Sequence, residues 1–365
     1  MEPTLDFEAC WRAVVARDAR FDGCFFTGVT STRIYCRPVC PARTPGRDNV
    51  TFHPSAAAAE AAGFRACLRC RPETAPDMGA WRGTSNTVSR ALALIEGGAL
   101  DGGDVDTLAA RLGVGERHLR RLFRQHLGAA PVSVAQTRRV LLAKQLIHET
   151  GLSMAQVALA SGFGSVRRFN EAFQALYGRP PSALRRRTAE GEATGPVKLG
   201  LAYRPPYDWA AIIAALTARG APGETVADGA WSRVLAPEFD GTTGSVTVRP
   251  GGPGRLAVEA TVETLSALPG VLARVRRVFD LAADPEAIAH DLAADPALRD
   301  SLARRPGLRP PGDWIDADET PPSDRLPARL DSPDLIARAE RWRPWRAYGA
   351  LHWTPSEETR HADAA

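Results

Sequence analysis

Cysteine is absent after position 70, and lysine occurs only at positions 144 and 198, although the chain has 46 basic residues. No stretch approaches the roughly 18 consecutive apolar residues of a membrane-spanning helix. Residues 1–18 mix charged and apolar side chains, so they lack the apolar core of a signal peptide. These absences predict a cytoplasmic protein with no membrane partner.

Six cysteines are present, and all of them lie within the first 70 residues. Disulfides are rare in the reducing cytoplasm, so clustered cysteines indicate metal binding or redox chemistry. Four of them form two short pairs, Cys36-Arg-Pro-Val-Cys40 and Cys67-Leu-Arg-Cys70, which 26 residues separate. Short loops bring two sulfurs to one metal ion, and two such loops complete a tetrahedron. The spacing therefore predicts a Zn2+ site made by Cys36, Cys40, Cys67 and Cys70.

The sequence around these pairs carries more information than their spacing. Residues 32–43, TRIYCRPVCPAR, and residues 63–70, GFRACLRC, closely resemble the N-terminal domain of the Ada family, over about residues 5–73. The resemblance implies that this domain repairs methyl phosphotriesters in DNA and that Cys36 accepts the methyl group. It also implies DNA contacts by Thr32, Arg43 and Arg65.

Zinc chemistry is compatible with that role. Zinc keeps its cysteine ligands deprotonated at neutral pH, so a bound thiolate is a nucleophile that needs no general base. A phosphotriester has lost its negative charge, so an anionic sulfur can approach its methyl carbon. Transfer leaves a stable thioether, which predicts a single turnover and lowers the formal negative charge of the site by one. Because phosphate contacts dominate DNA affinity, this change predicts stronger DNA binding and a switch in activity.

A closed site with four cysteines is more often structural than reactive. A zinc-stabilised transcription factor without methyl transfer is therefore an alternative hypothesis. The other two cysteines, Cys10 and Cys24, are expected to be small buried apolar residues. No cysteine follows Cys70, so the Pro-Cys-His-Arg motif of the second methyltransferase of many Ada proteins is absent, and repair of guanine O6 adducts is not predicted.

The middle of the chain repeats one helical plan. Residues 108–128 and 157–178 each combine an apolar face at helical spacing, a glycine turn and an opposite polar face, and a long helix at about 134–149 joins them. Such units are typical of helix-turn-helix domains. The ending at 172–185, AFQALYGRPPSALR, is similar to the C-terminal signature of AraC-family DNA-binding domains, and the resemblance covers about residues 88–187.

This second resemblance implies that two recognition helices enter successive major grooves of double-stranded promoter DNA. A helical core domain with arginine-rich solvated faces is the alternative. A regulator of this type also implies RNA polymerase as a partner. The candidate DNA contacts fall in residues 115–121 and 165–170, and they are Arg117, His118, Arg120, Arg121, Ser165, Arg167, Arg168 and Asn170.

Three further segments resemble alkyladenine glycosylases of the AlkA type. They are LAYRPPYDW at 201–209, LPGVLARVRRVFDL at 268–281 and AERWRPWRAYGALH at 339–352. The catalytic subdomain of that family contains a helix-hairpin-helix with a Leu-Pro-Gly-x-Gly hairpin, followed by a catalytic Asp. Residues 311–333 contain no such hairpin, and the Leu-Pro-Gly that begins at position 268 has leucine at position 272.

A glycosylase must flip a base and stabilise a cationic sugar with a carboxylate. Asp324 lies in a segment similar to the one that holds the family's catalytic Asp, and without the hairpin we interpret it as a remnant. Asp316, Asp318 and Glu319 are assigned no role. The hypothesis is that base excision is absent, and DNA-3-methyladenine glycosylase activity in base excision repair is the alternative enzyme function.

The 365 residues and 44% hydrophobic content predict two or three globular domains. The expected fold class is multidomain α+β, with a small zinc-binding α/β domain, an all-α tandem helix-turn-helix domain and a mixed antiparallel α+β C-terminal domain. The expected boundaries are an Ada-type domain at 1–73, a linker at 74–84, an AraC-type domain at 85–187, an AlkA N-terminal-like mixed domain at 197–292, and a loop with a remnant C-terminal helix at 293–365. The predicted function is that of a zinc-dependent, single-turnover DNA methyltransferase and sequence-specific transcriptional regulator of the response to alkylation damage.

Overall fold

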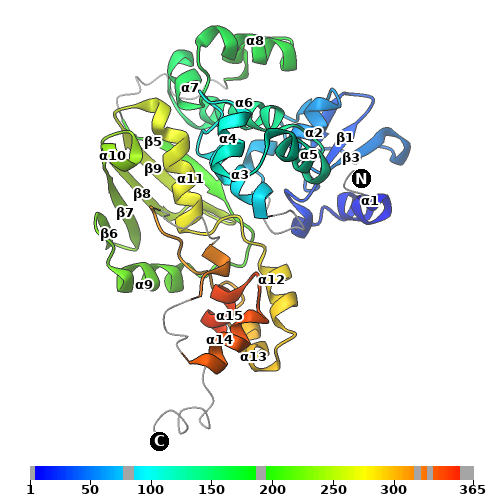
Figure 1. Cartoon of the computed structure of the whole chain (residues 1–365). Coiled ribbons are helices and arrows are strands. Elements are labelled where there is room, and N and C mark those ends of the chain that lie inside the picture. The colour runs from blue at the N-terminus through cyan, green and yellow to red at the C-terminus, as the bar shows by residue number, and fades with distance from the viewer. Residues whose placement is uncertain (1–4, 77–85, 186–194, 316–321, 327–331, 354–365) are drawn as a thin grey trace, which may run out of the picture.

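A computed structural model of the chain describes residues 5–76, 86–185, 195–315, 322–326 and 332–353. The N-terminal unit lies beside a helical middle unit, a sheet unit packs against that middle unit, and a small helical unit lies at the end of the molecule far from α8 (Figure 1). Among the residues described, none of the helices has the length and apolarity needed to cross a bilayer.

The N-terminal unit is built on a four-stranded sheet with the order β3-β1-β2-β4. Strands β2 and β4 run parallel, and the other neighbours are antiparallel. Helix α1 (Phe7–Ala16) packs with Phe52 on one face, and α2 (Ala56–Ala61) packs with Phe26 and Tyr35 on the other. The strands are β1 (Phe26–Val29), β2 (Ile34–Cys36), β3 (Val50–His53) and β4 (Arg65–Ala66).

Cys10 belongs to α1, and it shares a small core with Cys24. The two residues are 5% and 7% exposed. The expectation that both are small buried side chains is therefore confirmed. Burial raises the pKa of the Cys10 thiol to about 11, because a thiolate is disfavoured in apolar surroundings. Cys10 is thus an inert packing residue and not a metal ligand.

The middle unit contains the two helix-turn-helix motifs that the sequence repeat predicted. In each motif the turn passes through a glycine with positive φ, 69° at Gly113 and 87° at Gly162, a conformation that costs glycine no steric penalty. The helices are α3 (Asn86–Glu96), α4 (Val105–Arg111), α5 (Glu116–Leu127), α6 (Pro131–Glu149), α7 (Met154–Ala160) and α8 (Val166–Tyr177), followed by a short 3-10 turn at Pro181–Leu184.

Helix α6 is the joining helix, and it begins three residues earlier than the sequence pattern suggested. Pro131 occupies its first turn, where the missing N–H of proline has no intrahelical partner to lose. Its buried residues are distributed around the whole helix, so α6 is a core helix and not an amphipathic surface helix. It contacts α2 of the N-terminal unit, α7 of the second motif and β5 of the sheet unit.

The sheet unit is built on a five-stranded antiparallel sheet with the order β5-β9-β8-β7-β6. This sheet agrees with the mixed antiparallel α+β domain that we expected here. Buried and partly exposed residues alternate along β9, which is typical of a strand with one face on a core. Helix α11 (Leu268–Val278) contributes Leu272 and Val275 to this core. The other elements are β5 (Val197–Ala202), α9 (Trp209–Arg219), β6 (Glu224–Ala227), β7 (Ala230–Leu235), α10 (Pro237–Asp240), β8 (Gly244–Pro250) and β9 (Arg255–Val262).

The expectation of a loop with one remnant helix at 293–365 is wrong for the described residues. Three short helices lie there and pack with the preceding helix α12 (Pro285–Leu292) around a shared core, and the indole N–H groups of Trp342 and Trp345 donate 2.9 Å hydrogen bonds to Asp295 and Asp291. Proline and aspartate obscured this pattern because here they begin helices instead of breaking them. The three helices are α13 (Arg299–Arg304), α14 (Pro333–Glu340) and α15 (Arg346–His352).

His352 makes the stability of this small unit dependent on pH. The side chain is buried beside Ser301, and its burial lowers the pKa of the imidazole to about 4, below the 6.5 expected when unfolded. Between these values the unfolded chain binds a proton that the folded unit excludes, so lowering the pH from about 6.5 to 4 should cost about 3 kcal/mol of stability. Urea unfolding followed by tryptophan fluorescence at both pH values should show a smaller loss for His352→Gln. Equal losses in the two proteins would contradict this role.

Candidate metal centre

The four paired cysteines come from two loops that the sheet places side by side. Cys36 is the last residue of β2, and Cys67 directly follows β4. Because β2 and β4 pair in parallel, with Tyr35 opposite Ala66, these two cysteines leave the sheet at the same edge. The N–H of Cys67 donates a 3.0 Å hydrogen bond to the carbonyl of Tyr35, which continues the pairing by one residue.

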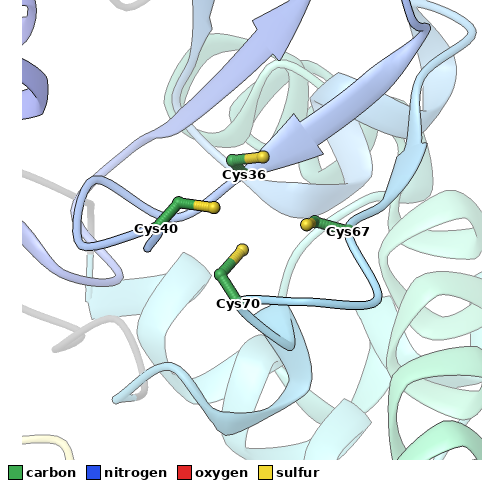
Figure 2. A group of neighbouring side chains, drawn as sticks. All are labelled: Cys36, Cys40, Cys67 and Cys70. Carbon is green, nitrogen blue, oxygen red and sulfur yellow. The ribbon is translucent and has the colours of Figure 1, made fainter. Parts of the chain in front are cut away.

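The sulfurs of Cys36, Cys40, Cys67 and Cys70 all lie within 4.8 Å of one another. Figure 2 shows the four side chains pointing toward a common centre. A tetrahedral zinc ion with Zn–S bonds of about 2.3 Å places its sulfurs roughly 3.8 Å apart, and thiolates are the ligands of structural zinc sites. The predicted ligand set is therefore brought together, and it fits Zn2+.

The thiols of this cluster compete for protons through their mutual hydrogen bonds. Hydrogen bonds to Cys40, and then to Cys67 and Cys70, raise the pKa of Cys36 far above its usual range. The contact from Cys36 is the largest of the effects that lower the pKa of Cys40 to about 7 and hold that of Cys67 well below its usual range. A bound dication removes this competition because it stabilises the thiolate form of every ligand.

The four sulfurs differ in exposure and in main-chain hydrogen bonding. Cys67 and Cys70 are buried, whereas Cys36 and Cys40 are half-buried. Main-chain N–H groups donate to the sulfurs of Cys70 and Cys67, from Arg37 at 3.4 Å and from Arg69 at 3.3 Å. Main-chain hydrogen bonding at Ala42 contributes to lowering the pKa of Cys40. Within the described residues, no main-chain N–H donates to the sulfur of Cys36.

Arg37 holds the two cysteine loops together. Its guanidinium pairs with Asp22 and also donates to the carbonyl of Cys70 at 3.2 Å and to the hydroxyl of Thr74 at 2.8 Å. Sequence reasoning missed this role, because the spacing of the cysteines assigns no function to the residues between them. An arginine inside a zinc loop is a signal for a buried carboxylate partner, but nothing local in the sequence identifies Asp22.

The three residues that the Ada resemblance assigned to phosphate contacts lie on the same unit. Thr32 is exposed in the turn between β1 and β2, Arg43 is exposed after the first cysteine pair, and Arg65 is half-buried on β4. Arg65 pairs with Ile34 across the parallel strands, so it lies two residues before Cys67 on the strand that leads to the metal site.

The candidate DNA contacts of the middle unit lie on α5 and on α8, except for Ser165, which directly precedes α8. Opposite them, Leu119 and Phe169 are fully buried, so each helix turns one face to the core and one to solvent. Some of these side chains have partners within their own helix. The hydroxyl of Ser165 accepts from the N–H of Arg168 and caps α8, Arg120 pairs with Glu116, and Arg167 pairs with Glu171. The exposed members of the set are Arg117, His118, Arg121, Ser165, Arg167, Arg168 and Asn170.

Replacing Arg37 should weaken metal binding without removing a ligand. The variant Arg37→Met loses every side-chain contact that ties the first loop to Asp22, Cys70 and Thr74, and such supporting contacts are typically worth about 10–100-fold in metal affinity. Competition with a chromogenic zinc chelator measures this loss. The matched control is Arg69→Met in the second loop, where Arg69 supplies only its main-chain N–H. Equal zinc affinity in the two variants would contradict the positioning role of Arg37.

Comparison with known proteins assigns a family to each of three segments. Residues 9–73 match the metal binding domain of Ada, residues 108–187 match a helix-turn-helix domain, and residues 198–315 match the AlkA N-terminal domain. The third match extends past the boundary at 292 that the sequence suggested, as far as Ile315. These matches agree in order and position with the three resemblances seen in the sequence.

Three curated relatives share parts of this arrangement. The probable bifunctional transcriptional activator/DNA repair enzyme AlkA of Mycobacterium tuberculosis is 41% identical over 312 residues, which are 84% of this chain and 62% of that protein. AdaA of Bacillus subtilis is 29% identical over 48% of this chain and 81% of its own length. Ada of Escherichia coli is 35% identical over 42% of each.

Both of these Ada proteins are described as bifunctional transcriptional activator/DNA repair enzymes. The chain spans less than two thirds of the length of the mycobacterial relative. The three matched segments all lie in this chain, one after another. The chain therefore joins, in this order, segments that match the metal binding domain of Ada, a helix-turn-helix domain and the AlkA N-terminal domain.

Proposed function

We propose that this protein removes methyl groups from methyl phosphotriesters in DNA by transferring them to Cys36, and that it regulates transcription in response to alkylation damage. One observation carries the proposal. Cys36 is partly accessible, and within the described residues its sulfur accepts no hydrogen bond from a main-chain N–H, unlike the buried Cys67 and Cys70. Of the two half-buried ligands, Cys36 and Cys40, the Ada resemblance singles out Cys36. The neighbouring pair of helix-turn-helix motifs links this chemistry to DNA.

The proposed step is a direct displacement at the methyl carbon. Bound Zn2+ supplies the positive charge that keeps Cys36 as a thiolate at neutral pH. The sulfur of Cys36 attacks the methyl carbon and forms a C–S bond. The bond between that carbon and the phosphate oxygen breaks. The phosphate oxygen leaves with the electron pair and restores the charge of the DNA backbone. No proton moves, so the site needs no general base, and the thioether ends the protein's single turnover.

Hydrogen bonding favours Cys36 over the other ligands. A main-chain N–H that donates to a thiolate stabilises negative charge, and that stabilisation is lost when the sulfur is methylated. Cys67 and Cys70 each accept such a bond, and main-chain hydrogen bonding at Ala42 lowers the pKa of Cys40. The two buried ligands are also shielded from a DNA substrate. Cys36 is therefore the nucleophile that loses least on reaction.

The methylated site should bind DNA more tightly. Transfer removes one negative charge close to the phosphate backbone, and like-charge repulsion falls accordingly. Thr32, Arg43 and Arg65 are the proposed phosphate contacts of this unit. Helices α5 and α8 are proposed to enter successive major grooves of promoter DNA, with RNA polymerase as the further partner in activation and the cytoplasm as the location.

The alternative function of a base-excision glycosylase is less well supported. The carboxylate of Asp324 is paired with Arg343 at 2.8 Å and with Arg346 at 2.9 Å. A carboxylate held by two guanidinium groups is a poor stabiliser of a cationic sugar, because its charge is already neutralised. Asp316, Asp318 and Glu319 lie outside the described residues.

Methyl transfer can be tested directly by mass spectrometry. After incubation with a duplex that contains methyl phosphotriesters, we expect one added methyl group in the zinc-loaded protein, on the peptide that contains Cys36. Cys36→Ser should show no adduct, and its zinc content must be measured because a ligand is lost. Cys10→Ser is the matched control and should react normally. An unmodified Cys36 in zinc-loaded protein would favour the structural-zinc alternative, and release of methylated base from a second duplex that contains 3-methyladenine would favour a glycosylase.

DNA binding by α5 and α8 can be tested on a duplex selected for binding from random sequence. We expect Arg117→Ala and Arg168→Ala each to weaken binding by about 1–2 kcal/mol and to reduce its salt dependence, because each removes a cation at the proposed interface. Fluorescence anisotropy at several salt concentrations gives both quantities. Arg249→Ala, on β8 of the sheet unit, is the control with a similarly exposed side chain. If all three variants bind equally, α5 and α8 do not face the DNA.

A further inference from the structure

A buried ion pair joins the second cysteine loop to helix α6 of the middle unit. The side chains of Lys144 and Glu73 are 0% and 1% exposed. The Nζ of Lys144 lies 2.7 Å from a carboxylate oxygen of Glu73 and donates a 3.0 Å hydrogen bond to the carbonyl of Cys67. A side chain of the helix-turn-helix domain thus holds a metal-binding loop from outside the metal-binding domain.

Arg71 adds a second connection between this loop and α6. Its guanidinium contacts Glu73 at 3.1 Å and Glu149, the last residue of α6, at 2.8 Å. The loop is therefore attached to α6 at Lys144 and again at the C-terminal end of the helix. Relative movement of the two elements would have to break both ion pairs.

The sheet unit is attached to the same end of α6. Glu149 accepts a 3.0 Å hydrogen bond from the N–H of Gly200 and pairs with Arg255 at 3.0 Å. Gln145 donates to the carbonyl of Gly200 at 2.8 Å. Gly200 belongs to β5, an edge strand of the five-stranded sheet, so side chains of α6 satisfy main-chain groups that an edge strand leaves unpaired.

The choice of lysine at position 144 is itself informative. All other basic residues of the chain are arginine except Lys198, whose side chain is 65% exposed. Lysine is a compact point charge, which suits a closed space between one carboxylate and one carbonyl oxygen. Because desolvation offsets much of the Coulombic gain, a buried pair of this kind contributes little net stability, but separating its members is strongly unfavourable.

We propose that Lys144 is a positioning residue for the metal centre, and that through it metal binding and DNA binding are energetically coupled. Helix α6 joins the two helix-turn-helix motifs, so the position of the Cys67–Cys70 loop and the relative orientation of α5 and α8 are set together. The sheet unit stabilises the position of α6 through its contacts with Glu149. Such coupling is reciprocal, so DNA must tighten zinc binding as much as zinc tightens DNA binding. The inference rests on the proposed function, because it takes DNA as the ligand of α5 and α8.

The test uses the full zinc-loaded chain and the duplex selected from random sequence. Release of Zn2+ to a chromogenic chelator is followed with and without saturating duplex, and DNA affinity is measured with and without zinc. We expect the duplex to slow release from the wild type by about five- to tenfold. In Lys144→Met, release should be faster, and the duplex should change it by less than about twofold. Lys198→Met, at the other lysine, should behave as the wild type.

A second variant separates coupling from folding. Lys144→Met leaves Glu73 with only Arg71 as a partner, so Lys144→Met combined with Glu73→Gln removes both buried charges and protects the fold. This double variant should keep the wild-type circular dichroism and still lack the effect of DNA on zinc release. If the duplex slows release equally in the wild type and both variants, the inference is overturned while the proposed function stands. If the wild type does not bind the duplex at all, both the inference and the proposed function fail.

Discussion

The convergence of four sulfurs within 4.8 Å is the constraint on which the N-terminal unit depends. Residues 36 and 67 are far apart in the chain, and the parallel pairing of β2 with β4 brings them to one sheet edge. Arg37 then ties the two loops through Asp22 and the carbonyl of Cys70. Because a mutual competition for protons disfavours four thiolates without a metal, the same geometry that assembles the ligands also makes them dependent on a dication.

Helix α6 extends this constraint to the rest of the molecule. Thr137 donates a 2.6 Å hydrogen bond to Glu60 of α2, which also accepts from the hydroxyl of the buried Tyr35. Lys144 and Glu149 then contact the cysteine loop and the sheet unit. One helix therefore carries polar contacts to both neighbouring units while its apolar residues form the centre of the middle unit. The segment that matches the AlkA N-terminal domain thus contacts the end of α6 through Gln145 and Glu149.

The C-terminal segment shows that short helices can be missed when secondary structure is predicted from composition. Composition predicted a loop with one remnant helix over 293–365. Asp284, Asp295 and Ser332 instead cap helices or turns, and the prolines that follow them occupy first-turn positions. Trp342 and Trp345 then close a core that no short-range pattern identifies, because its members come from four separate helices.

Local spacing and periodicity, which a linear pattern records, were enough to predict the ligands of the metal and the two helix-turn-helix motifs and to show that residues 311–333 lack the hairpin motif. The antiparallel character of the sheet unit was expected from the AlkA resemblance alone. Three features required the folded structure: the different exposure of the four sulfurs, the pairing of Arg37 with Asp22, and the burial of Lys144 against Glu73. These depend on contacts between residues 15 or more positions apart, whose burial and partners arise only when separate elements pack together.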